Sequence, residues 1–203
     1  MLASQPGPMT LEDFLVWEAA QDAKWELVDG RPVPRSQRWG VDPVTGMAGA
    51  SFRHNLIAAN ILRHLGNRLA GGPCFALPSD QMVQNADGAA RYPDVVVECG
   101  RPQNTARLAQ EPRVLFEVLS PSNTARQQLR LIADYQVIAT LQHVVFVEQA
   151  EPFVMLWTRN ADGWRAVEHK GMDAALPLGA IGAELTMAEI YERVSFDPVG
   201  END

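Results

Sequence analysis

Residues 92–98 (YPDVVVE) and 114–120 (VLFEVLS) decide the fold, because each is a short apolar run that contains acidic residues. Side chains along a strand alternate between the two faces of a sheet. In the second run, this alternation puts Glu117 on the same face as Leu115 and Leu119. A carboxylate among leucines needs a partner or a metal ion, since burying an isolated charge is costly. Glu117 is therefore a candidate metal ligand.

Asp94 stands at the start of the first run. Pro93 has no amide to donate to a neighbouring strand, so Asp94 is expected at a strand end beside the strand of Glu117. Two carboxylates in that position suit Mg²⁺, which commonly binds one or two carboxylates, keeps several waters and leaves room for a substrate phosphate. The alternative is that Asp94 is a solvent-facing residue at a strand edge.

The chain on either side of these runs alternates between helical and strand patterns, which predicts an α/β fold. Apolar residues recur at helical spacing after Ser51, whose hydroxyl can cap free backbone amides, and after Ser122 or Thr124, near which a second helix should begin. The sequence WELVDGRPV predicts a hairpin, since Asp-Gly tolerates a tight turn. We expect helices at residues 10–20, 51–69, 122–138 and 187–194, a loop at 35–50, candidate strands of one sheet at 74–77, 81–84, 93–98 and 114–119, and three more strands at 143–148, 153–157 and 164–169.

Length and composition indicate a folded protein with one core. The chain has 203 residues, of which 46% are hydrophobic and 21% are charged, as is usual for one globular domain. Its net charge of −8 weakens attraction to phosphate backbones, so any contact with nucleic acid must be local. The alternatives for the arginines in the middle of the chain are a basic patch or a solvated surface of mixed charge. These arginines are Arg101, Arg107, Arg113, Arg126 and Arg130.

Cysteine spacing and hydropathy argue against a disulfide-rich, a zinc-binding and a membrane-spanning protein. Cys74 and Cys99 have no CxxC spacing, so we predict that both are small core residues and form neither a disulfide framework nor a zinc site. The N-terminal residues show no basic segment followed by an apolar run, and no stretch of about 18 apolar residues occurs. We therefore expect a cytoplasmic protein without a membrane span.

Several short motifs, taken in order and spacing, resemble the Uma-type family of restriction endonucleases. The resemblance covers about Met9 to Val194. It implies a PD-(D/E)XK fold, in which a restriction-endonuclease-like central mixed β-sheet is flanked by helices. It also implies a single domain at residues 9–194, with flexible termini at 1–8 and 195–203. The motifs are WELVDG (25–30), SFRHN (51–55), YPDVVVE (92–98), VLFEVLSPSN (114–123) and DYQ (134–136).

The resemblance implies roles for individual residues. Asp94 and Glu117 match the two acids of the family's metal site, and Glu26 matches an early glutamate that is a third ligand. His54 matches a histidine at the start of the long helix and is a candidate catalytic residue. For His54 the alternative is a hydrogen-bonded core histidine, since it shares a helix face with Ile57. For Glu26 the alternative is a charged residue on a hairpin.

The chain departs from the family at the helix after the second acidic strand. There the family usually has an Asp and, four residues later, a Lys, but this chain has Gln127 and Leu131. The lysine matters because phosphodiester cleavage develops negative charge that a nearby cation stabilises. Arg130 is adjacent to Leu131, but successive helical residues point about 100° apart.

Two functions therefore stay open. The first is an endonuclease that uses Mg²⁺ or Mn²⁺ to cleave DNA, with metal at Glu26, Asp94 and Glu117 and the scissile phosphate held by Arg130 or Arg126. The second is an inactive relative that binds a partner or nucleic acid. A homodimer is expected by analogy with enzymes that cut both strands of a duplex.

Overall fold

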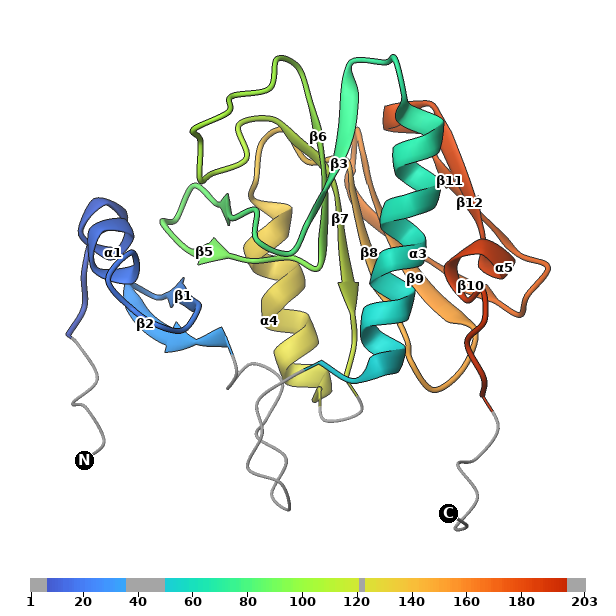
Figure 1. Cartoon of the computed structure of the whole chain (residues 1–203), viewed down its shortest axis with the longest axis horizontal. Helices are drawn as coiled ribbons and strands as arrows, with labels where there is room; N and C mark the ends of the chain where they lie inside the picture. Colours follow the sequence, from blue (N-terminus) through green and yellow to red (C-terminus); the bar gives the residue numbers. More distant parts are fainter. Residues whose placement is uncertain (1–6, 36–49, 121–122, 197–203) are drawn as a thin grey trace, which may run out of the picture.

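A computed structural model of the chain describes residues 7–35, 50–120 and 123–196, and its centre is a six-stranded sheet (Figure 1). The strand order is β10-β9-β8-β7-β6-β3. β7 runs parallel to β8, and the other neighbouring strands are antiparallel, so the sheet is mixed as expected. The strands are β3 (Cys74–Pro78), β6 (Val95–Cys99), β7 (Pro112–Val118), β8 (His143–Val147), β9 (Phe153–Asn160) and β10 (Gly163–Lys170).

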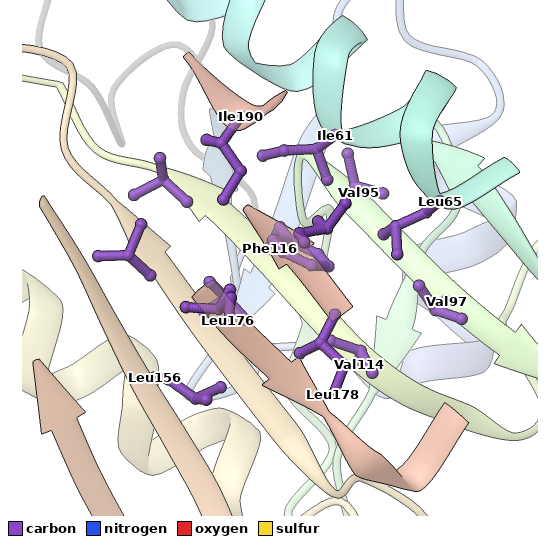
Figure 2. Close-up of a cluster of buried hydrophobic side chains, with 14 of the residues drawn as sticks. Ile61, Leu65, Val95, Val97, Val114, Phe116, Leu156, Leu176, Leu178 and Ile190 are labelled. Atoms are coloured by element: carbon purple, nitrogen blue, oxygen red, sulfur yellow. The ribbon is translucent and has the colours of Figure 1, made fainter. Parts of the chain in front are cut away.

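Two helices cover opposite faces of this sheet. Ser51 caps α3 (Phe52–Leu69) through its side-chain oxygen, as the sequence predicted. Thr124, one of the two candidate start residues, caps α4 (Ala125–Gln136) in the same way. Figure 2 shows the α3 face, where Ile61 and Leu65 lie over the sheet strands. The alternation expected in β7 is confirmed. Val114, Phe116 and Val118 join the cluster under α3, whereas Leu115 and Leu119 join the cluster under α4.

A smaller four-stranded sheet, in the order β2-β1-β5-β4, lies beside the main sheet. The predicted hairpin of β1 and β2 is present. Asp29 and Gly30 form its turn, with positive φ angles of 49° and 69°. One prediction is wrong: residues 81–84 do not belong to the main sheet. Only Val83–Gln84 form a strand, and it pairs with a two-residue strand that is too short to show in the hydropathy pattern. The elements are α1 (Leu11–Glu18), β1 (Trp25–Val28), β2 (Arg31–Pro34), β4 (Val83–Gln84) and β5 (Ala90–Arg91).

The C-terminal part closes the α3 face of the core. A hairpin that the hydropathy pattern did not predict contributes Leu176, Leu178 and Leu185 to the cluster under α3. The predicted closing helix is shorter than expected, and the side chain of Thr186 caps it. The elements are β11 (Ala175–Leu178), the 3-10 turn η1 (Gly179–Ile181), β12 (Ala183–Thr186) and α5 (Met187–Ile190).

The prediction that the cysteines form no disulfide is also wrong, because Cys74 and Cys99 are bonded to each other. Both pack in the cluster under α3, as was expected of small core residues. The two residues are directly opposite each other in the antiparallel pair of β3 and β6. A separation of 25 residues in the sequence does not predict that the two cysteines face each other, because the register is set only when the two strands pair.

Most of the predicted loop at residues 35–50, and the predicted flexible ends at 1–6 and 197–203, lie outside the described residues. No helix in the described ranges is both long enough and apolar enough to cross a membrane.

Candidate active site

Asp94 and Glu117 are neighbours across the strand pair β6–β7. Val95 pairs with Phe116, so the next position along each strand puts Asp94 opposite Glu117. The backbone N–H of Asp94 donates to the Phe116 carbonyl at 3.0 Å, and its carboxylate accepts from the Val118 N–H at 2.8 Å. These two bonds lie on either side of Glu117 in β7. The sequence prediction that both acids stand at one point of the sheet is therefore correct for the backbone.

The Asp94 carboxylate is almost fully buried, and cationic or polar groups hold both of its oxygens. One oxygen is 3.1 Å from His54 Nε2, at the start of α3, and the other is 3.2 Å from Arg35 Nη2, at the end of β2. The side chain of Asp94 is only 2% exposed. The alternative of a solvent-facing aspartate at a strand edge is thus wrong, because the side chain turns inward onto α3 and the small sheet.

Glu117 is fully buried and turns toward α4. Its Oε1 accepts a hydrogen bond from the hydroxyl of Tyr135 on α4. Because α3 and α4 lie on opposite faces of the sheet, His54 and Tyr135 contact the Asp94 and Glu117 carboxylates from different helices. In the described ranges, no group of three or more His, Cys, Asp and Glu side chains is arranged to hold a metal ion.

Glu26, the third predicted acid, lies on β1 and is also buried. Its Oε2 accepts from Arg91 Nη1 at 2.9 Å, and its Oε1 accepts from the Tyr92 N–H at 3.0 Å. Arg91 also pairs with Asp134 of α4 through Nε at 3.0 Å. The side chain of Arg91 is 10% exposed, so this is a largely buried chain of charges that ties the small sheet to α4. The alternative of a solvent-exposed hairpin charge at Glu26 is therefore wrong.

Tyr92 links the acidic strand to α1. Its hydroxyl donates to the Glu18 carboxylate at 3.2 Å. Burial, followed by the nearby Glu18 carboxylate, raises the pKa of Tyr92 to about 12, so the phenol stays neutral and keeps its proton for this bond. Glu18 in turn pairs with Arg107. These contacts fix the segment that leads into Asp94.

Arg130 lies apart from the acids. It pairs with Asp29 of the hairpin turn, and its side chain is 49% exposed. Arg126 is exposed at the start of α4. Of the arginines that formed the candidate basic patch, Arg107 and Arg130 each pair with an acid on a different element, and Arg113 pairs with Glu111 two residues away, which favours the mixed-charge surface.

Two cavities flank the acidic strands. The larger, of about 620 Å³, is lined by Asp94 together with His54, Arg35 and Lys24. The smaller, of about 230 Å³, lies beside α4 and is lined by Glu26, Arg91 and Arg130 among others. Asp94 thus borders one of these spaces and Glu26 the other, and Glu117 lines neither.

Comparisons with known proteins agree with this architecture. A family model, Uma2, described as "Putative restriction endonuclease", matches residues 11–188. The chain belongs to this family. It is 29% identical, over 198 residues, to the uncharacterised protein slr1290 of Synechocystis sp., a match that covers 95% of this chain and 97% of that protein. A crystal structure from Anabaena variabilis, titled a "putative nuclease belonging to DUF820", has the same fold, with a TM-score of 0.70 and 16% identity over 91% of this chain and 98% of that one.

Gln127 and Leu131, where this member departs from the Uma2 pattern given above, both line the smaller cavity. Leu131 is 7% exposed and belongs to the apolar cluster under α4. Its side chain therefore lies beside the Glu26–Arg91 pair and carries no charge. The position matched to the family lysine is next to the predicted acids, but here it contributes packing.

The structure adds three residues that the sequence patterns did not select. Arg35 and Arg91 contact two of the predicted acids, and Tyr135 contacts the third. No local pattern identifies the arginines, because their partners are separated from them by 59 and 65 residues. Tyr135 was a motif residue, and the helical spacing that buries it beside Leu131 was a usable signal.

Proposed function

We propose that this chain is a Mg²⁺-dependent endonuclease, with Mn²⁺ as a substitute metal, that hydrolyses phosphodiester bonds of DNA at a degenerate active site. The observation that carries the proposal is the pairing of Asp94 with Glu117 across β6–β7 beside a cavity that Asp94 lines. Membership of the Uma2 family supports it.

The donor chemistry of these residues suits a hard divalent cation, because such ions prefer carboxylate oxygens. Asp94 and Glu117 would hold the ion, with Glu26 as a further ligand. Bound there, the ion would lower the pKa of a water and neutralise charge on the phosphate. Loading the site requires Arg35 to leave one oxygen of Asp94 and Tyr135 to leave Glu117. Arg35, once released, is a cation close enough to hold the phosphate.

His54 has a supporting role in this proposal. Its Nε2 lies 3.1 Å from the Asp94 oxygen that also accepts from Val118, so the imidazole fixes the carboxylate against the strand. Because Arg130 is paired with Asp29 at the surface, it would have to exchange that partner to reach a phosphate. Arg35 is therefore the better candidate for holding the substrate.

The test is metal-dependent cleavage of DNA by the purified chain. Asp94→Asn and Glu117→Gln keep the shape of each side chain and remove its charge, so both should abolish cleavage and Mn²⁺ binding. Glu98→Gln is the matched control, since Glu98 is a buried carboxylate at the far end of β6 that accepts from backbone amides. Cleavage that survives both site variants would exclude this site.

A second candidate function is binding of nucleic acid or a protein partner without cleavage. It is favoured by Leu131, an apolar side chain at the position of the family lysine. Leu131→Lys distinguishes the two. If the Leu131→Lys variant cuts DNA and the natural chain does not, the natural chain is a degenerate nuclease. One well-placed cation is commonly worth about 100-fold to 1000-fold in rate. If the natural chain already cuts at ordinary enzyme rates, the binding function is excluded.

Homodimerisation and a cytoplasmic location complete the proposal. Two copies would allow both strands of a duplex to be cut, and light scattering of the purified chain tests the dimer. Fractionation of cells that express the chain tests the location.

A further inference from the structure

The larger cavity has a shape and charge that the metal site alone does not explain. It lies between α3 and the residues on either side of the β1–β2 hairpin, and its volume is about 620 Å³, within the usual range for small-molecule sites. The α3 wall is Ala58, Ala59 and Leu62, and the facing wall is Ala23, Lys24 and Arg35. The alanines on both walls have short side chains, which keep the space open.

Positive charge is concentrated on one side of this cavity. The Nε of Arg35 is buried and has no hydrogen-bond acceptor among the described residues. Lys24 is 45% exposed, and its closest acid, Asp80, is 3.9 Å away and 76% exposed. A buried N–H donor without an acceptor is unfavourable, so an anionic oxygen at this wall would stabilise the site. The cavity thus combines a cationic wall with an apolar wall.

We propose that this cavity receives one unpaired nucleotide of a single DNA strand. Its phosphate would lie against Arg35 and Lys24, and its base against Ala58 and Leu62. A base within a duplex cannot enter such a space without leaving its stack. The net charge of −8 also disfavours a long run of phosphate contacts and permits a short one. The inference rests on the proposed function in one respect: Asp94, on the inner wall, would hold the metal ion that acts on the phosphodiester.

The experiment measures binding in EDTA, so that it does not depend on cleavage. Fluorescence anisotropy compares a short labelled single strand with the same strand annealed to its complement, and a deoxynucleoside monophosphate serves as a competitor. Ala58→Trp fills the cavity, and Ala59→Trp fills it from an exposed position if the first variant does not fold. Ala133→Trp, at an exposed position of α4, is the control. Circular dichroism verifies that each variant is folded.

The expected result is that the single strand binds at least about tenfold more tightly than the duplex, a difference of about 1.4 kcal/mol. Filling the cavity should remove this preference, and the control should retain it. Lys24→Gln should weaken binding, whereas Lys170→Gln, at a similarly exposed lysine, should not.

Equal binding of duplex and single strand overturns the inference, as does unchanged binding by the filled variants or no binding by the folded natural chain. Strand binding that the monophosphate does not displace also overturns it, because the strand is then bound outside the cavity. The proposed nuclease function fails separately, through loss of metal-dependent cleavage. A chain that cuts duplex DNA equally well with the cavity filled would keep that function and lose this inference.

Discussion

Replacing Arg35 by glutamine should strengthen binding of Mn²⁺ at Asp94. Arg35 Nη2 lies 3.2 Å from Asp94 Oδ1, and the two side chains are 19% and 2% exposed, so the pair is mostly shielded from water. An arginine and a metal ion compete for the same oxygen, because each neutralises the same charge. Removing the arginine therefore favours the metal.

The size of the effect follows from this contact. A hydrogen bond to a charged group is worth about 1.5–3 kcal/mol, and we take the lower end because Arg35 is partly exposed. Since about 1.4 kcal/mol corresponds to a tenfold change in affinity, the dissociation constant for Mn²⁺ should fall about tenfold. Calorimetric titration or electron paramagnetic resonance of free Mn²⁺ measures this constant.

The control is Arg68→Gln. Arg68 pairs with Glu189 from the last turn of α3, whereas His54 lies in the first turn of that helix, so the loss of Arg68 should leave Mn²⁺ affinity unchanged. Asp94→Asn combined with Arg35→Gln should bind no Mn²⁺ at this site. If Arg35→Gln binds Mn²⁺ equally or more weakly, Arg35 does not compete for the metal and the reasoning from the 3.2 Å contact fails.

Three further predictions concern stability. The double change Cys74→Ala and Cys99→Ala should lower the free energy of unfolding by about 3 kcal/mol in urea titrations, because the disulfide closes a separation of 25 residues in the unfolded chain; equal stability with and without reductant would contradict this. Tyr135→Phe should cost about 2 kcal/mol, since it removes the hydroxyl that donates to the buried Glu117 carboxylate, and thermal unfolding measures it. Burial lowers the pKa of His143, so the unfolded chain binds the proton first as the pH falls below about 6.5, and stability should then decrease. His143→Gln should make that pH dependence shallower, and an unchanged slope would show that other groups cause it.

Much of the local structure follows from short-range physics that can be read along the chain. Ser51 was predicted as a cap because a hydroxyl accepts from amides within one helical turn, and it does so. Asp29-Gly30 turns the hairpin because Asp and Gly tolerate positive φ. The burial of Glu117 followed from the period of a strand, which depends on no distant residue.

The parts that were missed depend on pairing between distant segments. The Cys74–Cys99 disulfide and the move of Val83–Gln84 into the small sheet both follow from strand register. Register is chosen by the total burial of whole strands, and two-residue strands leave no hydropathy pattern.

The candidate site divides in the same way. The sequence by itself determined that Glu117 lies on the buried face of its strand and that Asp94 stands at a strand start, because alternation and the proline before Asp94 are local properties of the chain. Only the tertiary structure decided that Asp94 is buried. It also decided the partners of both acids, namely Arg35 and His54 for Asp94 and Tyr135 for Glu117. The physical reason is that a buried carboxylate takes the nearest donors in space, and packing of α3, α4 and the small sheet brings those donors from distant parts of the chain.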